Sequence, residues 1–339
     1  MPTPLRELTT LRVGGAPTRL VEATDTDALV DAVRSADESG EPVLLVAGGS
    51  NLLVADDGFD GTAVCVRSKG IAVEDDGEHV LVTVAAGHTW DDVVARAVAE
   101  GWSGIEALSG IPGSTGATPV QNVGAYGQEV AQTITHVRVW DRAHSRERVL
   151  PGEECGFAYR MSRFKADPTR FVVLDVTFRL RRDGASAPVA YAELARSLAV
   201  DVGSRAPLAD VRDAVLTLRR GKGMVLDSAD HDTWSAGSFF TNPILDDDTH
   251  VPDGAPRFPA PAGRVKTSAA WLIEHAGFDK GYGLPGPAAL STKHTLALTN
   301  RGSATAADLL GLAREVRDGV EKVFGIRLVN EPVLVGCAL

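Results

Sequence analysis

The stretch Ser109-Gly-Ile-Pro-Gly-Ser-Thr-Gly-Ala-Thr-Pro-Val-Gln-Asn-Val-Gly-Ala-Tyr126 decides how this chain folds around a ligand. It contains too many glycines for a helix and too many apolar residues for a solvated linker. Its backbone N–H groups and polar side chains such as Ser114 and Gln121 can bind polar groups, while apolar side chains such as Ile111 and Val120 can face a planar ring. We therefore interpret the stretch as a loop that wraps around a ring-containing ligand.

A second glycine-containing stretch, Gly48-Gly49-Ser50-Asn51-Leu52-Leu53, follows a buried strand that we predict over residues 42–47. Glycines let several backbone N–H groups turn toward one anion. Taken alone, such a stretch is more often a simple turn, and only the loop at 109–126 makes a nucleotide site the better interpretation. The next residues are again apolar and extended. Because neither the G-x-G-x-x-G spacing nor a following helix is present, the sequence does not predict a Rossmann fold.

Length and composition limit the class of protein. The chain has 339 residues, of which 44% are hydrophobic and 23% charged, so we expect a globular protein of two or three subdomains with ligands between them. A net charge of -11 argues against a general role in nucleic-acid binding. The start, Met1-Pro2-Thr3-Pro4, lacks the apolar region of a signal peptide, and no stretch is apolar enough to span a bilayer. We expect a cytoplasmic protein that does not insert into membranes.

Hydrophobic periodicity predicts a mixture of helices and strands. A capping box at Thr24-x-x-Asp27 predicts a helix that ends at Gly40, and a second box at Thr89-x-x-Asp92 predicts a helix that runs to Gly101. Residues 172–180 give the clearest strand alternation, and we expect a domain edge soon after them. The other predicted elements are a strand at 80–84 and helices near 207–220 and 309–323.

Cysteines and histidines give no sign of a metal or a disulfide. Cys65, Cys155 and Cys337 are odd in number, far apart and free of a C-x-x-C pair, so we interpret all three as small core residues. Asp230-His231-Asp232 lacks further ligands at zinc spacing, and we predict no metal site. The acidic run Asp246-Asp247-Asp248 is typical of a solvated loop.

Five ordered motifs along nearly the whole chain resemble the UDP-N-acetylenolpyruvoylglucosamine reductases of peptidoglycan synthesis, which use FAD and NADPH. The resemblance is to the subgroup that has a tyrosine in its substrate loop. The motifs are Gly48-Gly49-Ser50-Asn51-Leu52-Leu53, Ile111-Pro112-Gly113 with Gln121-Asn122-Val123-Gly124-Ala125-Tyr126-Gly127, Tyr159-Arg160-x-Ser162-x-Phe164-Lys165, Gly237-Ser238-Phe239-Phe240-x-Asn242-Pro243, and Glu331-Pro332.

The resemblance implies an α+β fold, with a two-part FAD-binding domain of the vanillyl-alcohol-oxidase/PCMH type and a smaller α+β substrate-binding domain. By that likeness, residues 1–66 and 67–203 hold FAD together with a C-terminal return over 328–339, and residues 204–327 form the substrate-binding domain. Many oxidases of the wider group attach their flavin through a histidine in the first loop. This chain has Ser50 and Asn51 there, which implies noncovalent FAD.

The same likeness assigns the cofactor site to the two glycine loops and supplies the reaction partners. NADPH is the implied hydride donor, UDP-N-acetylglucosamine enolpyruvate the implied substrate, and the protein a monomer or weak oligomer. The implied FAD-binding residues are Gly48, Gly49, Ser50, Asn51, Leu52, Leu53, Ile111, Pro112, Gly113, Ser114, Thr115, Gly116, Gln121, Asn122, Gly124, Ala125 and Tyr126.

Three residues match the catalytic positions of the family, whose reaction adds a hydride to the enolpyruvyl double bond and a proton to the neighbouring carbon. Arg160 can stabilise the intermediate charge on the substrate carboxylate, because arginine offers two parallel hydrogen bonds. Ser238 matches the proton donor, although a Gly-Ser turn by itself is usually structural. A charged Glu331 would repel the intermediate, so we expect it to be protonated or to act through Arg160.

The implied substrate-binding residues are Tyr159, Tyr191, Lys222 and Asn242. A tyrosine can stack on or bond to a phosphate, and a lysine offers a point charge for a diphosphate. A packed tyrosine and a solvated lysine beside Arg219 are equally good interpretations of the residues themselves. Two other functions would share the glycine loops. The later motifs argue against the first, an FAD-dependent oxidase of the same fold, and the presence of Arg160, Ser238 and Glu331 argues against the second, a non-catalytic nucleotide-binding module.

Overall fold

The structure is a computed structural model that describes residues 2–339, so Met1 lies outside the described residues. The chain forms two compact units that each combine distant segments. The sheet unit comprises residues 18–48 and 60–221. The terminal unit comprises the N-terminal segment to Pro17, residues 49–59 and residues 222–339.

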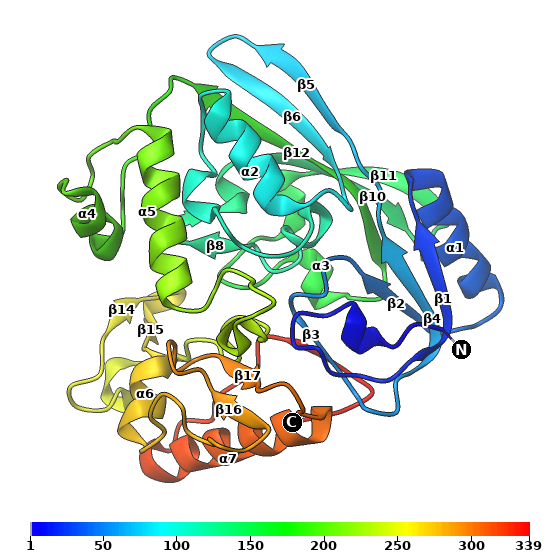
Figure 1. The fold of residues 1–339 in the computed structure, drawn as a ribbon. Coiled ribbons are helices and arrows are strands. Elements are labelled where there is room, and N and C mark those ends of the chain that lie inside the picture. The colour runs from blue at the N-terminus through cyan, green and yellow to red at the C-terminus, as the bar shows by residue number, and fades with distance from the viewer. Residues whose placement is uncertain (1) are drawn as a thin grey trace. The chain divides into compact units, whose positions relative to one another are not determined.

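A six-stranded antiparallel sheet forms the framework of the sheet unit (Figure 1). Its long central strand β12 (Phe171–Arg182) pairs on one side with β10 (Ile134–Asp141) and on the other with β6 (His79–Ala85). Along β6, Val80, Val82 and Val84 are buried and alternate with half-buried residues. The strands predicted at 172–180 and 80–84 are therefore confirmed, and their buried faces join the largest hydrophobic core.

A smaller sheet in the same unit has the strand order β1 (Pro17–Ala23), β4 (Phe59–Val66), β2 (Val43–Val46). Helix α1 (Thr26–Glu38) connects β1 to β2, as predicted, but its first turn differs from the prediction. The N-cap is Asp25, whose side chain accepts a hydrogen bond of 2.8 Å from the N–H of Ala28. The predicted box at Thr24 and Asp27 was wrong because the adjacent Asp25 is a better placed acceptor.

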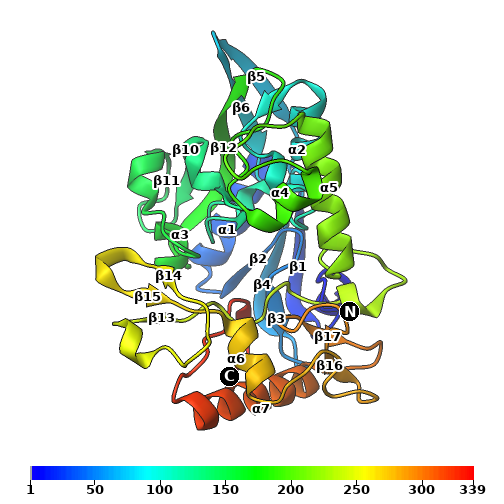
Figure 2. The same cartoon turned by 90° about the vertical axis from the view of Figure 1, so that its left-hand side faces the viewer.

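Helices α2 (Trp90–Ala99) and α5 (Leu208–Gly221) confirm two further predictions and lie near each other in the sheet unit (Figures 1 and 2). Thr89 is the N-cap residue of α2, but among the described residues its side chain makes no capping bond. Its hydroxyl instead lies 3.4 Å from Nζ of Lys69, which donates to it. The predicted start is thus correct, and the predicted capping bond is not made.

The terminal unit is built on helix α7 (Ala306–Phe324), which runs beneath the hairpin β16 (Ala288–Leu290) and β17 (Leu298–Asn300) (Figure 2). Thr305 and Asp308 form its capping box. The predicted helix is confirmed, except that Val323 is 54% exposed and does not belong to the buried face. A separate parallel pair joins β3 (Leu52–Val54) to β18 (Val333–Val335) and so brings the C-terminal segment back to the first glycine loop.

Short elements complete both units. They are β5 (Ile71–Asp76), β7 (Trp102–Ser103), β8 (Gly124–Ala125), β9 (Gln128–Glu129), β11 (Arg146–Pro151), α3 (Arg163–Ala166), α4 (Ala192–Leu198), β13 (Ile244–Leu245), β14 (Phe258–Pro259), β15 (Val265–Lys266) and α6 (Ala269–His275). The run 246–248 is exposed, as predicted.

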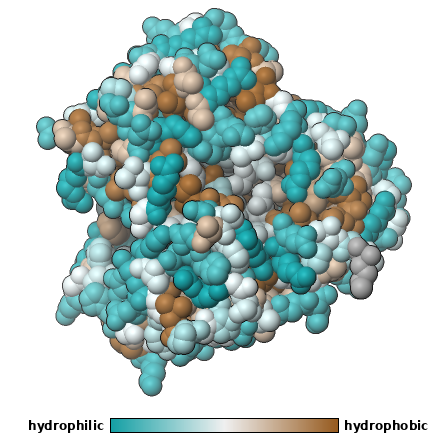
Figure 3. All heavy atoms as spheres, in the orientation of Figure 1, coloured by the Kyte–Doolittle hydropathy of each residue, from teal (hydrophilic) through white to brown (hydrophobic). Residues whose placement is uncertain are grey.

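The three cysteines are free thiols. Cys65 and Cys155 are fully buried, as predicted, and burial raises the pKa of Cys155 to about 11. Cys337 is half-buried and packs against the edge of a hydrophobic core, so the prediction of a core residue is confirmed only in part for it. On the face drawn in Figure 3, hydrophobic side chains gather in separate patches divided by hydrophilic ones. Within residues 2–339, none of the helices combines the length and the apolar character needed to cross a bilayer.

Asp141, at the end of β10, offers a test of what holds the large sheet. Its carboxylate is fully buried and accepts hydrogen bonds from Arg170, His144 and Arg148. Burial alone would raise the pKa of Asp141, but these hydrogen bonds hold it well below its ordinary value. A group whose pKa is lowered by folding stabilises the fold above its unfolded pKa, near 4, and this stabilisation is lost as the pH falls toward its folded pKa.

Asp141→Asn should therefore lower the free energy of unfolding at pH 7 by about 2 kcal/mol. The difference from wild type should shrink progressively below about pH 4. Urea unfolding at pH 7 and pH 3 measures both values, with the exposed Asp213→Asn as the control. A difference that stays constant over this pH range would contradict the ion pairs as its source.

Candidate active site

The first glycine loop connects β2 to β3, and its backbone is closely packed on both sides. Gly49 has a φ of +60°, and a Cβ atom there would lie 1.9 Å from the carbonyl oxygen of Leu8. A Cβ atom on Gly48 would lie 2.5 Å from Cα of Gly113, in the second loop. Only glycine fits at both positions, and the contact between Gly48 and Gly113 brings the two predicted cofactor loops together within the sheet unit.

Backbone donors are available where these loops meet. Within residues 2–339, the N–H groups of Gly48, Gly113 and Ser114 donate to no other group of the protein. The next two residues differ, because Thr115 and Gly116 donate to backbone carbonyls at 2.8 Å. Unused N–H groups beside a backbone contact that excludes any side chain suit a pyrophosphate, which needs close approach and several donors. The donor set thus fits a dinucleotide such as FAD.

The first turn of α2 holds the second loop in place. The backbone N–H of Trp90 donates to the carbonyl of Gly113 at 3.1 Å, and its indole Nε1 donates to Leu108 at 3.2 Å. Asp91 accepts the N–H of Gly110 at 2.6 Å and a bidentate pair of bonds from Arg212 on α5. Burial would raise the pKa of Asp91, but the bonds from Arg212 and Gly110 lower it.

The side chain of Asn122, predicted to bind FAD, is used inside the protein. Its Nδ2 donates to Glu129 at 2.7 Å and to the carbonyl of Ala158 at 3.2 Å, while its Oδ1 accepts the N–H of Ala131 at 3.1 Å. The residue has a φ of +46° and is almost fully buried. Its observed role is to hold the loop, and any contact with a cofactor would have to come from its backbone.

Arg160 lies at the tip of a tight turn, with Ala158 and Met161 paired through two backbone hydrogen bonds of 3.0 and 3.1 Å. Its Nη2 donates to the carbonyl of Gly124 in the second loop at 3.0 Å, and its own carbonyl accepts a bond from Lys165. Ser162 caps α3 and also donates to Val120 at 2.6 Å. The structure therefore brings the predicted arginine to the second glycine loop.

The terminal unit places Ser238 and Glu331 on neighbouring segments. The backbone N–H of Glu331 donates to the carbonyl of Phe239 at 2.8 Å, and Phe240 is bridged to Asn330. Both phenylalanines are buried, whereas Ser238 is half-buried after Gly237, whose φ is +73°. The predicted proton donor is thus one residue away from a direct backbone bond to the predicted glutamate.

The first glycine loop also contacts the glutamate segment. Asn51 Nδ2 lies 3.4 Å from the carbonyl of Glu331, and the carbonyl of Asn51 accepts the N–H of Val333 at 2.9 Å. These bonds continue the parallel pairing of β3 with β18. Within the terminal unit, the structure brings together Asn51, Ser238 and Glu331.

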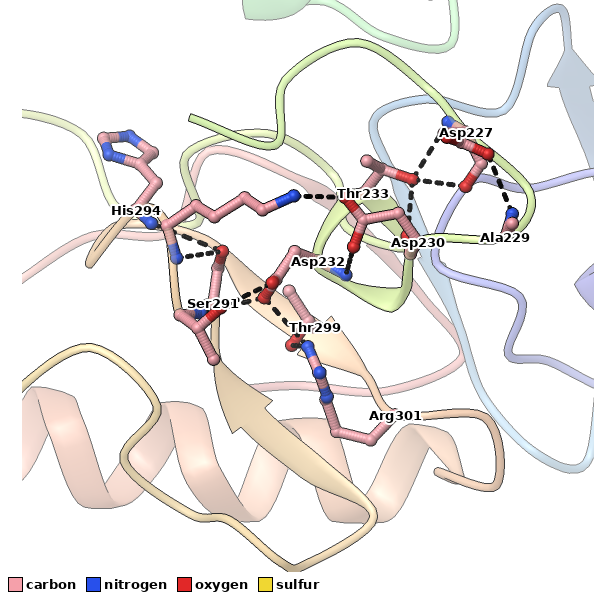
Figure 4. A network of polar contacts seen from close by, with 11 residues as sticks. Asp227, Ala229, Asp230, Asp232, Thr233, Ser291, His294, Thr299 and Arg301 are labelled. Carbon is pink, nitrogen blue, oxygen red and sulfur yellow. Dashed lines mark hydrogen bonds and ion pairs between the residues drawn. The ribbon is translucent and has the colours of Figure 1, made fainter. Parts of the chain in front are cut away.

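A polar network that sequence reasoning missed supports the segment before Ser238 (Figure 4). The buried carboxylate of Asp232 accepts bonds from the N–H and hydroxyl of Thr292 at 2.8 and 2.6 Å, and from Arg301 at 2.9 Å. Burial would raise the pKa of Asp232, but these bonds lower it. Two residues on, the carbonyl of Trp234 accepts the N–H of Asn300 on β17 at 3.0 Å. The network fixes this segment on the β16–β17 hairpin.

The four predicted substrate residues lie in both units. In the sheet unit, Tyr191 is 50% exposed and its ring meets that of Tyr126 edge-on at 5.8 Å, while Tyr159 precedes Arg160 in the tight turn. In the terminal unit, Lys222 is half-buried after α5, and Asn242 Oδ1 accepts the N–H of Ala269 at 2.9 Å at the start of α6.

Arg219, which precedes the predicted substrate residue Lys222 by three positions, is half-buried on α5. Burial lowers its pKa to about 10, against the opposing effects of Tyr126 and Asp91. Among the described residues, no group of three or more histidine, cysteine, aspartate or glutamate side chains could hold a metal ion.

Two family profiles match separate parts of this chain. The profile of the FAD binding domain matches residues 17–147, and that of the C-terminal domain of UDP-N-acetylenolpyruvoylglucosamine reductase matches residues 229–335. The reductase of that name from Thermobifida fusca (strain YX) is 59% identical, over 99% of this chain and 98% of its own. The one from Streptomyces coelicolor is 58% identical, over 99% and 90%.

A solved structure is similar along the whole chain. It is the crystal structure of UDP-N-acetylenolpyruvylglucosamine reductase from Thermus caldophilus, with a TM-score of 0.68 and 26% identity, covering 98% of this chain and 97% of that one. This match and the FAD-binding profile confirm the predicted α+β fold class with an FAD-binding domain.

The contact between the glycine loops yields a direct test. Gly48→Ala should force the loops apart, because its Cβ would meet the backbone of Gly113 at 2.5 Å. We expect FAD affinity, measured by quenching of flavin fluorescence, to fall by about tenfold or more, the factor that corresponds to about 1.4 kcal/mol. Gly311→Ala is the control, since a Cβ there meets nothing within 4 Å and should only stabilise α7. Unchanged FAD affinity in Gly48→Ala would contradict a cofactor site at this contact.

Proposed function

This chain belongs to the UDP-N-acetylenolpyruvoylglucosamine reductase family, and from that premise we propose that it reduces UDP-N-acetylglucosamine enolpyruvate to UDP-N-acetylmuramate with NADPH as the electron source. The reaction supplies a precursor of peptidoglycan. The observation that carries the proposal is the bonding of the Ser238 segment to the Glu331 segment, because the reaction needs a proton donor and an acidic group held together. The reaction also needs a cation for the charge on the substrate carboxylate, and we assign this role to Arg160, which is bonded to the second glycine loop.

We assign noncovalent FAD to the two glycine loops, where the unused N–H groups of Gly48, Gly113 and Ser114 would hold its polar part. FAD held there would supply hydride transfer from NADPH to the enolpyruvyl double bond. The division into FAD-binding residues 1–66, 67–203 and 328–339 and substrate-binding residues 204–327 is part of the proposal. So are a cytoplasmic location, where NADPH and UDP-linked sugars are available, and a monomeric or weakly associated state.

The protein's own groups stabilise the negative charge on the substrate carboxylate and supply the proton for the neighbouring carbon. Arg160 donates to the substrate carboxylate and so stabilises the negative charge that spreads onto it after hydride addition. The hydroxyl of Ser238 gives its proton to the adjacent carbon, which is far more basic than the hydroxyl. Burial of Phe239 and Phe240 beside it removes water from that side of the serine. Glu331 acts as a neutral donor.

Binding of the UDP group falls to the substrate residues. Lys222 offers a point charge for the diphosphate, and Tyr191 and Tyr159 offer rings and hydroxyls. Asn242 has its Oδ1 bonded at the start of α6, so its Nδ2 is the atom that would donate to a substrate.

The overall test is spectroscopic: the purified protein should be yellow, and UDP-N-acetylglucosamine enolpyruvate should reoxidise the flavin after reduction by NADPH. A colourless protein without FAD affinity would overturn the proposal.

Ser238→Ala separates the two half-reactions. Flavin reduction by NADPH should stay within about twofold of wild type, while reoxidation by the enolpyruvyl substrate should slow by roughly 10²-fold or more, the scale of a lost general acid. Stopped-flow absorbance of the flavin measures both rates. Ser235→Ala, three residues upstream, removes the acceptor of the Gly237 N–H and controls for disturbance of the turn. Equal slowing of both half-reactions would count against proton donation by Ser238.

Glu331→Gln tests whether this residue acts as a neutral donor. The amide keeps a donor at the same place, so flavin reoxidation should be about tenfold or more faster in Glu331→Gln than in Glu331→Ala. The comparison uses the same stopped-flow reoxidation assay at saturating substrate. If both variants lose the same activity, the neutral-donor role fails.

A further inference from the structure

The segment that carries Tyr191 is held by a buried glutamate that the proposed reaction does not use. Glu106 is 1% exposed in the short helix before the second glycine loop. One carboxylate oxygen, Oε1, accepts the backbone N–H of Ala187 at 2.7 Å and Nε2 of Gln128 at 2.8 Å. The other oxygen accepts the N–H of Gly104 at 2.6 Å. One side chain therefore binds both the end of the glycine loop and the segment that leads to Tyr191.

Two further contacts join the same two segments. Gly127 has a φ of +87°, and a Cβ atom on it would lie 2.8 Å from Cβ of Ala190. The rings of Tyr126 and Tyr191 meet at 5.8 Å with an interplanar angle of 89°. Three consecutive residues, 126–128, where the second glycine loop ends and β9 begins, thus contact the segment 187–191, either directly or through Glu106.

The three contacts differ in strength. The carboxylate of Glu106 is buried, its bond from Gln128 is buried, and its bonds from Ala187 and Gly104 are partly buried, so a donor that loses this acceptor carries a desolvation cost. The edge contact of Tyr191 is exposed on one side, since half of that side chain is accessible. Because backbone at the base of a loop controls where its tip lies, the bond from Ala187 restrains Tyr191, together with the backbone bonds of 2.8 Å that join Val189 to Ser204 and Gly203.

We infer that Glu106 is a positioning residue that ties Tyr191 to the flavin-binding loop. The loop that holds the cofactor then also sets the position of the substrate-binding tyrosine. This inference rests on the proposed function, because it takes Tyr191 as a contact of the UDP-linked substrate. Glu106 touches neither substrate nor cofactor in this role and acts through the backbone of residue 187.

Glu106→Gln replaces one acceptor oxygen by an NH2 group of nearly the same size. Three donors then compete for one oxygen, so at least one of the N–H groups of Ala187, Gly104 and Gln128 loses its partner. We expect the Kd of UDP-N-acetylglucosamine enolpyruvate, measured from the change in oxidised-flavin absorbance without NADPH, to rise about tenfold. Flavin reduction by NADPH should stay within about twofold. In the apoprotein, trypsin should cut the exposed Arg182 and Arg196 faster.

A double-mutant cycle with Tyr191→Ala distinguishes positioning from general damage. If Glu106 acts through Tyr191, Glu106→Gln should raise the substrate Kd by less than about twofold once Tyr191 is removed. The same factor in both backgrounds would overturn the inference. Tyr191→Ala with an unchanged Kd would instead overturn the proposed substrate role of Tyr191, so the two failures are distinguishable.

Two other variants complete the design. Asp141→Asn is the matched control, because it removes a buried, hydrogen-bonded carboxylate elsewhere in the same unit and should leave the Kd unchanged in both backgrounds. Ala187→Pro attacks the bond from the other end by removing the N–H that donates to Glu106. If Glu106→Gln does not fold, Ala187→Pro replaces it in the double-mutant cycle with Tyr191→Ala, and the same results support or contradict the inference.

Discussion

The close contact between Gly48 and Gly113 is the constraint on which the sheet unit depends. A side chain on Gly48 would begin 2.5 Å from Cα of Gly113, so the two loops can approach only as bare backbone. The carbonyl of Gly113 is in turn bonded to the first turn of α2 through Trp90. Strand β2 and helix α2 therefore have a fixed relation at this point. The N–H groups of Gly48 and Gly113 are left for a ligand because the approach leaves no room for a protein side chain.

A glycine-rich loop gains this access at a cost, since it forms few regular backbone bonds of its own. Polar side chains replace them. Asn122 makes three bonds to the protein, Thr115 donates to the carbonyl of His88 at 3.1 Å, and Ser162 links α3 to the loop at Val120. Residue types that resemble ligand contacts in a sequence thus serve to satisfy backbone groups that would otherwise be buried without partners. Asn242 does the same for α6.

Local patterns account for what the sequence could predict. Alternating valines identified β6, and apolar spacing identified α5 and α7, because burial of one face of a strand or helix produces a regular spacing of apolar residues along the sequence. The choice of Asp25 over Thr24 as a cap and the exposure of Val323 depend on geometry at single positions, which periodicity does not resolve. The family motifs identified Arg160, Ser238 and Glu331 as candidates. They could not show that Arg160 bonds to Gly124, or that Glu331 bonds to Phe239.

The residues that the sequence could not reveal share one physical property. Glu106 binds a backbone N–H 81 positions away, and Asp232 binds Thr292 60 positions away. Nothing in either local sequence distinguishes such a carboxylate from a solvated one. Each unit uses a buried carboxylate where a short irregular segment must be held without a strand ladder. A carboxylate suits this task because it accepts several N–H bonds at once, and each is stronger than a neutral pair. Its desolvation cost makes every one of those bonds necessary. The segment near Tyr191 and the segment near Ser238 are therefore each held in a single backbone conformation.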